Sequence, residues 1–328
     1  MNNNHTIHHY FFISALVTIF TLGCMWGAIN LLMIGLEENF HSIDYSWVLA
    51  HGHAMVFGFV GLFIMGFSYR ALPHFMNTTL WKPQLAISTL PLMIFGILLQ
   101  AYAHVIAPRQ PYLLLGISAG IIQIIAVVVF ALVIVRTMQS ATIRGSSAGL
   151  SIAALGWFLI AAILNPIIFW LFESPSTQEE FLFNVSSFNI PYRDIQTLGI
   201  AVMMILGVSL HILPNAYGFR EPTKRWRNFL LWGVNGAILF GVISFTAGMT
   251  TGVHWWHAAN GITYIILLVA AIGTPIQFRL FSKVQSGNSD RSLKFIRAAY
   301  IWFIVAMLLL AFGPYYMFGI YLPMTGGD

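Results

Sequence analysis

Charge and cysteine are what this sequence has least of. Of its 328 residues, 8% are charged and 58% are hydrophobic. So few charged side chains cannot cover the surface of a soluble protein of this size, and the mean hydropathy of +0.80 agrees with that. The composition therefore excludes an ordinary soluble globule and predicts an all-α, polytopic bundle of transmembrane helices.

The single cysteine, Cys24, lies inside the first apolar run. One cysteine excludes a disulfide, a covalent CxxCH haem attachment and a zinc site built from several Cys ligands within this chain. Histidine is then the main candidate for metal or haem binding, and the chain has 11 of them.

A helix of about 20 apolar residues crosses about 30 Å of hydrocarbon, and nine apolar runs in the sequence have this length. They lie near residues 10–35, 47–71, 84–105, 111–136, 147–172, 194–214, 228–250, 256–280 and 297–320. Residues 1–9 are polar and lack Lys and Arg, so we expect the first run to be a retained helix and not a cleaved signal peptide. We expect one transmembrane domain over 1–328, with repeat halves near 10–136 and 147–320.

The distribution of positive charge predicts the orientation. If the N-terminus is cytoplasmic, thirteen of the fifteen Lys and Arg residues lie inside, and only Arg109 and Arg193 lie outside. The positive-inside rule therefore predicts a multi-pass protein of a bacterial inner membrane, with its N-terminus in the cytoplasm and its C-terminus in the periplasm. The net charge of +5 is then a signal of topology in the lipid membrane and indicates no nucleic-acid binding.

The longest connection, near residues 173–193, is predicted to be an outside loop. Phe181, Phe183 and Tyr192 would anchor it at the membrane interface, as aromatic residues often do. The alternative is that this loop is a docking surface for an extracytoplasmic partner.

Histidines open two of the apolar runs. His51 and His53 open the second, and His254 and His257 open the eighth, three residues apart and so on one helix face. Imidazole in a membrane needs a partner, which a metal or haem iron would supply. The alternative is that these are wetted interfacial residues with ordinary hydrogen bonds, and the small residues beside them also serve helix packing.

Other polar residues fall at the same predicted level. Asp194 and Gln196 open the sixth run and are candidates to hydrogen-bond a ligating imidazole, while Arg193 is a candidate partner for haem propionates. A second cluster at the inner side is formed by Arg70, His74 and His211. It indicates ordinary snorkelling and helix capping or, alternatively, a quinone or second cofactor site.

The second and sixth runs look like copies of one element. At an offset of 141 residues, Gly58 aligns with Gly199, Gly66 with Gly207 and Pro73 with Pro214, while His53 aligns with Asp194. Ser68 with Ser209 and Leu72 with Leu213 complete the five identities at this offset. Such a parallel repeat is known from membrane transporters, and five identities in a glycine-rich background can also arise by chance.

The segment HGHAMVFGFVGLFIMGFSYRALPHF resembles the second helix of subunit I of the haem-copper oxidases, and it is similar to the His-rich start of that helix in the NnrS family of haem- and copper-containing membrane proteins. The stretch RDIQTLGIAVMMILGVSLHILPNAYGFR resembles the later repeat of the same element. The resemblance implies haem b bound by His53, with His51 as the fallback. The second ligand would come from the later repeat, but Asp194 stands there, so we expect His257 or His254 instead.

Three functions follow from these expectations. The first is a respiratory electron-transfer subunit that takes electrons from a c-type cytochrome or another respiratory subunit. The second is an NnrS-like protein that responds to nitric oxide or oxygen, or a terminal reductase, with copper as a second candidate cofactor; the His-His pair of the oxidase copper site is not found in the sequence. The third is a transporter or structural subunit without a cofactor.

Overall fold

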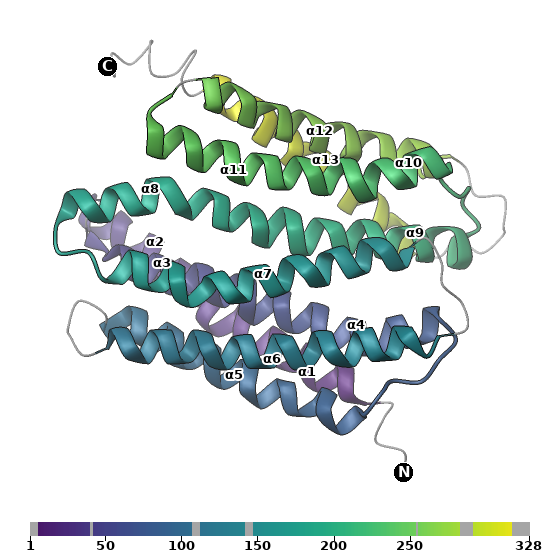
Figure 1. Ribbon diagram of the computed structural model, residues 1–328, viewed down its shortest axis with the longest axis horizontal. Helices are drawn as coiled ribbons and strands as arrows, with labels where there is room; N and C mark the ends of the chain where they lie inside the picture. The colour runs from purple at the N-terminus through teal and green to yellow at the C-terminus, as the bar shows by residue number, and fades with distance from the viewer. Residues whose placement is uncertain are drawn as a thin grey trace. The chain divides into compact units, whose positions relative to one another are not determined.

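The computed structural model describes residues 6–39, 42–106, 112–141, 147–253, 255–282 and 291–316. Within these ranges the regular structure is helical, and nine helices are long and apolar enough to cross a membrane. The predicted all-α polytopic bundle is therefore confirmed (Figure 1).

Several of the nine spans combine α-helical and π-helical segments. The spans and their segments, in chain order, are α1 (Ile7–Thr18), η2 (Ile19–Met25) and α2 (Trp26–Glu37); α3 (Tyr45–His53), η4 (Ala54–Gly61) and α4 (Leu62–Phe75); α5 (Pro83–Ile106); α6 (Leu113–Gln139); α7 (Ser147–Glu173); α8 (Gln178–Asp194), η5 (Ile195–Val202) and α9 (Met203–Tyr217); α10 (Lys224–Asn228), η6 (Phe229–Val234) and α11 (Asn235–Thr251); α12 (Trp255–Phe278); and α13 (Ser292–Tyr316).

These helices group into two compact units. The first contains the described residues up to Ala148 together with Ala154–Met204, and the second contains Gly149–Ala153 and the described residues from Ile205 onward. Within the first unit, α5 and α6 pack side by side along their lengths (Figure 1). The candidate site lies entirely in the first unit, and the single domain with repeat halves stays a prediction.

The prediction of a loop near residues 173–193 is wrong, because most of this segment forms the helix α8. The Thr177 side chain accepts a hydrogen bond from the backbone N–H of Glu180 at 3.2 Å, which caps the helix, and two glutamates in the first turn suit the positive end of the helix dipole. The span therefore runs from Gln178 to Tyr217, 40 residues, and Asp194 lies within it and not at its start. Hydropathy did not show this because α8 is polar.

Two of the π-helical segments occupy equivalent places in the proposed repeat. The segment η4 begins at Ala54 and η5 at Ile195, and both are 8 residues long. Their starts are 141 residues apart (195 − 54), which is the offset of the sequence repeat. The matching positions of these segments agree with the predicted repeat. Because π-helical turns are uncommon and often lie at functional sites, the residues just before each segment are candidates for a functional site.

The core of the first unit contains a connected series of aromatic rings. The His53 ring stacks on Phe57 with ring centroids 4.9 Å apart, and Phe57 contacts Phe158 at 5.9 Å. Phe130 contacts Phe158 at 6.1 Å and Tyr69 at 5.3 Å. This apolar core lies beside His53, so the imidazole sits at a border between rings and polar groups.

Candidate functional site

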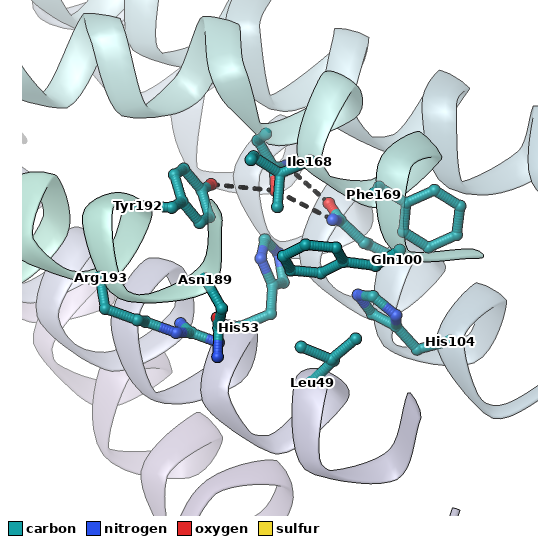
Figure 2. Close-up of a pocket in the computed structure, with 11 residues that line it drawn as sticks. Leu49, His53, Gln100, His104, Ile168, Phe169, Asn189, Tyr192 and Arg193 are labelled. Atoms are coloured by element: carbon teal, nitrogen blue, oxygen red, sulfur yellow. Dashed lines mark hydrogen bonds between the residues drawn. The ribbon is translucent and has the colours of Figure 1, made fainter. Parts of the chain in front are cut away.

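A small polar cavity in the first unit is the candidate functional site. Its volume is about 20 Å³. Its polar lining comes from four spans and consists of His53, Gln100, His104, Asn165, Asn189, Tyr192 and Arg193 (Figure 2). The apolar lining consists of Leu49, Ile168, Phe169 and Phe172. We call it the His53 cavity.

His53 is the buried imidazole of this cavity that comes from the second span. It is the last residue of α3, immediately before η4, and only 4% of it is exposed. Its Nε2 atom is buried and makes no hydrogen bond of good geometry among the described residues, although the Gln123 side chain lies close enough to interact with the imidazole. A buried imidazole nitrogen without a well-formed hydrogen bond is costly, so His53 is a candidate ligand residue.

His104, from α5, is held in a defined orientation. Its Nδ1–H donates to the Glu173 carboxylate at 2.6 Å, and the Ser46 hydroxyl donates to the other carboxylate oxygen at 3.1 Å. The side chains of His104 and Glu173 are 5% and 6% exposed. A carboxylate on Nδ1 leaves Nε2 as the nitrogen that can bind a ligand, which is the usual arrangement of metal-binding histidines.

A network of amides closes the cavity toward α6 and α7. The Gln100 side chain donates to Asn165 Oδ1 at 3.0 Å, and Gln100 Oε1 accepts from Asn165 and from Gln123, each at 2.7 Å. The Tyr192 hydroxyl donates to Asn165 Oδ1 at 3.2 Å (Figure 2). These hydrogen bonds hold the wall in one arrangement where water is scarce, and only Gln123 Oε1 among these four side chains is buried without a hydrogen bond of good geometry in the described part of the chain.

Arg193 brings positive charge to the cavity without a carboxylate partner. Its Nη1 donates to the Gly52 carbonyl at 3.2 Å and to Gln196 Oε1 at 3.0 Å, and both acceptors are neutral. Neither of the ion pairs found among the described residues includes Arg193. Gly52 and Arg193 are themselves 141 residues apart, so this hydrogen bond joins positions that are equivalent in the predicted repeat.

The structure separates the two histidines of the second span. His53 lines the cavity, whereas the His51 Nδ1–H donates to the Gly23 carbonyl in η2 at 3.1 Å. His51 therefore has an ordinary structural partner, and His53 is the stronger ligand candidate. Asp194 and Gln196 are buried, at 9% and 1% exposure, but neither lines the cavity.

The remaining predicted residues are not brought to this cavity. His254 lies outside the described residues, and His257 belongs to α12 in the second unit, with a side chain that the structure does not describe. Arg70 and His74 are exposed residues of α4, while His211 belongs to α9 in the second unit. Their predicted roles stay predictions.

The amides, Glu173 and His104 were not among the site residues predicted from the sequence. Gln100, Gln123 and Asn165 are lone polar residues inside apolar runs, which is itself a signal of an intramembrane function or network. No sequence signal pairs His104 with Glu173, because 69 residues separate them.

The side chains that line the cavity suit a haem iron, but the volume of the cavity is too small for a haem. Two imidazoles from different spans line one cavity, and one has an unpartnered Nε2. About 20 Å³ holds only one or two water molecules, whereas pockets for larger ligands have volumes of about 300–1,000 Å³. A macrocycle therefore fits only if apolar lining residues such as Phe169 move aside.

A protein-only metal site has less support. Among the residues that the structure describes, no group of three or more His, Cys, Asp or Glu side chains could hold a metal ion. Copper as a second cofactor thus stays a prediction without a described ligand set.

Comparisons with known proteins give no family assignment. No family model matches the chain, and no curated protein matches it significantly.

Proposed function

We propose that this chain is an integral membrane haem protein that transfers electrons, with His53 as an iron ligand. The observation that carries the proposal is that two imidazoles from different spans, the buried His53 and His104, line one cavity. We choose His53 as the ligand because the second span resembles haem-binding helices.

We assign the second imidazole to His104 because it shares the His53 cavity. Glu173 accepts the Nδ1 proton of His104 and thereby fixes its tautomer, so that Nε2 is free to bind. His257 stays the alternative suggested by the sequence. When bound, a haem iron with two imidazole ligands supplies one-electron transfer.

The orientation of the chain belongs to the same proposal. With the N-terminus in the cytoplasm of a bacterial inner membrane, the start of the second span and the end of the third lie toward the periplasm. The His53 cavity would then be within reach of a periplasmic donor such as a c-type cytochrome or another respiratory subunit. An iron with one open position would instead suit an NnrS-like response to nitric oxide or oxygen.

The small volume of the cavity favours a second candidate function. A cavity of about 20 Å³ lined by ionisable side chains suits the passage of protons or small ions through a transporter without a cofactor. A transporter of this kind would use the polar lining as it stands and would require no movement of Phe169.

Two measurements on the purified full-length chain separate these functions: a pyridine haemochrome assay, which gives the type and amount of haem, and absorption spectra of the untreated, reduced protein with and without carbon monoxide. We expect about one haem b per chain and a sharp reduced α-band that carbon monoxide shifts little. His104→Ala should weaken or broaden this band, whereas His257→Ala should leave it unchanged. Protein that contains no haem after expression with ample haem supply would rule the proposal out, and a strong carbon monoxide shift would favour the gas-binding alternative.

A further inference from the structure

The amide network in the wall of the His53 cavity is joined to α3 at both of its ends. At one end, the Gln123 side chain lies close enough to the His53 imidazole to interact with it. At the other end, the Gln196 side chain lies close enough to the Tyr192 hydroxyl to interact with it. Gln196 also accepts a hydrogen bond from Arg193, which donates in turn to the backbone of α3. The polar groups therefore form one continuous series that returns to the helix of His53.

Arg193 fixes the direction of this series at one end, because a guanidinium can donate hydrogen bonds but cannot accept them. Its Nη1 donates to Gln196 Oε1 at 3.0 Å, so the Gln196 amide must present its oxygen to Arg193. The Nε2 of Gln196 then lies at the other end of the amide. Gln196 is 1% exposed, and a buried amide N–H needs an acceptor. The Tyr192 hydroxyl oxygen is the acceptor within reach.

The Tyr192 hydroxyl passes the same direction on to the amides. Since its oxygen accepts from Gln196, its O–H donates to Asn165 Oδ1 at 3.2 Å. Asn165 therefore presents its Nδ2 to Gln100 Oε1, at 2.7 Å, and the Gln123 Nε2 donates to this same oxygen, also at 2.7 Å. The Gln123 amide, with its nitrogen used in this way, has its Oε1 left as an acceptor.

The series ends at the imidazole of His53. Gln123 Oε1 and His53 Nε2 are both buried, and neither makes another hydrogen bond of good geometry in the described ranges. An amide oxygen can only accept, so this pair is complementary only when the proton of the neutral imidazole is on Nε2. The lone pair of the ring then lies on Nδ1.

We propose that Arg193 is a positioning residue that sets the direction of these hydrogen bonds, so that Gln123 holds His53 in the tautomer with its proton on Nε2. Metal-binding histidines usually donate the N–H of one ring nitrogen to a fixed acceptor and bind with the other, so Nδ1 is the nitrogen left for a ligand. This consequence for haem rests on the proposed function, whereas the tautomer itself does not.

The test is nitrogen NMR of the full-length protein in detergent micelles, labelled with ¹⁵N-histidine and prepared without haem. The measurement is made at about pH 8, where an ordinary imidazole is neutral. The His53 signals are assigned by their loss in His53→Gln. We expect a protonated Nε2 and an Nδ1 with the shift of a nitrogen that carries a lone pair. A protonated Nδ1, or two averaged signals from a mixture of tautomers, would overturn the proposal.

The matched variant is Gln196→Glu, which keeps the shape of the side chain and an oxygen acceptor for Arg193. A carboxylate cannot donate to Tyr192, so the series loses its direction at that point. We expect the two His53 signals to become averaged, although residue 196 does not line the cavity. An unchanged single tautomer in Gln196→Glu would refute the role of Arg193.

Two variants of Arg193 itself give a second test. Arg193→Lys keeps a group that can only donate and should retain the single tautomer of His53, whereas Arg193→Met should give averaged signals. A single tautomer in Arg193→Met would contradict the proposal. Ser118→Ala is the control, because Ser118 is an exposed residue of α6 that donates only within its own helix, and it should leave the His53 signals unchanged.

Haem content separates a failure of this proposal from a failure of the proposed function. A chain that binds no haem but shows the expected tautomer would refute the proposed function and support the role of Arg193. A chain that binds haem but shows the other tautomer in its haem-free form would refute the role of Arg193 alone.

Discussion

The second and sixth spans share a backbone design but differ in the polar residue that each presents. Each span has an α-helix, a π-helical segment of 8 residues and a second α-helix. The residue before the π-helical segment is His53 in one span and Asp194 in the other, and both are buried. The two spans therefore share the same order of helical segments, while an imidazole precedes the π-helical segment in only one of them.

Removal of His53 should have the largest effect. We expect His53→Ala to abolish haem binding, because it removes the proposed iron ligand, and Asp194→Asn to retain close to one haem per chain. The pyridine haemochrome assay, normalised to protein, measures both. Equal losses in the two variants would show that the two spans do not differ in chemistry as we propose.

Glu173→Gln should have the next largest effect. It removes the charge from the hydrogen bond to His104 and disturbs the hydrogen bond from Ser46, both of which are partly buried. We expect a loss of about 3 kcal/mol in the free energy of unfolding, measured by denaturant titration in mixed micelles. Glu179→Gln is the control, because Glu179 is exposed, and it should change stability by less than about 0.5 kcal/mol.

The paired glycines of the two spans should respond unequally. A Cβ on Gly199 would lie 2.7 Å from the buried Trp157 ring, whereas a Cβ on Gly58 would meet the side-chain methyl group of Thr18. Because a rigid indole yields less readily than a small side chain, Gly199→Ala should cost about 2 kcal/mol and Gly58→Ala about 1 kcal/mol or less.

Gly156→Ala is the control for both glycine variants, since nothing lies within 4 Å of a Cβ added there. It should be neutral or slightly stabilising, as expected for alanine in a helix. If Gly58→Ala proves the costlier of the pair, the packing of the two spans differs from the one described.

The helix caps of the two spans should give the smallest effects. Asp44 accepts from the Ser46 N–H at 3.1 Å at the start of α3, and Thr177 does the same for Glu180 at the start of α8. Replacing either by alanine should cost about 1 kcal/mol. A fall in helical circular dichroism with Thr177→Ala but not with Asp44→Ala would show that α8 depends more strongly on its cap.

Most of the fold could be predicted from hydropathy, because a span must be apolar to be stable in lipid. All nine expected runs coincide with long helices in the described part of the chain. The exception, α8, is polar and depends on a cap and acidic first-turn residues, which a hydropathy window does not detect.

The site could be predicted only in part. His53 was expected because an ionisable residue in an apolar run has few structural reasons to be there, and Arg193 because it is one of two cations predicted on the outer side. The pairing of His104 with Glu173 depends on how α5 and α7 pack. The position of a residue within one apolar run does not show which residue of another span lies beside it. The same limit applied to His51, which was separated from His53 only by its bond to Gly23.

The π-helical segments have a consequence for insertions and deletions. A π-helical turn can be regarded as an α-helical turn that has absorbed one extra residue, and each residue of an α-helix advances by about 100°. Deleting a single residue within η4 would let the helix return to regular geometry, but it would rotate every residue on the His53 side by that angle relative to the rest of the span. A change of one residue in the length of such a span therefore redirects the imidazole away from the cavity, whereas a substitution elsewhere in the span leaves its direction unchanged.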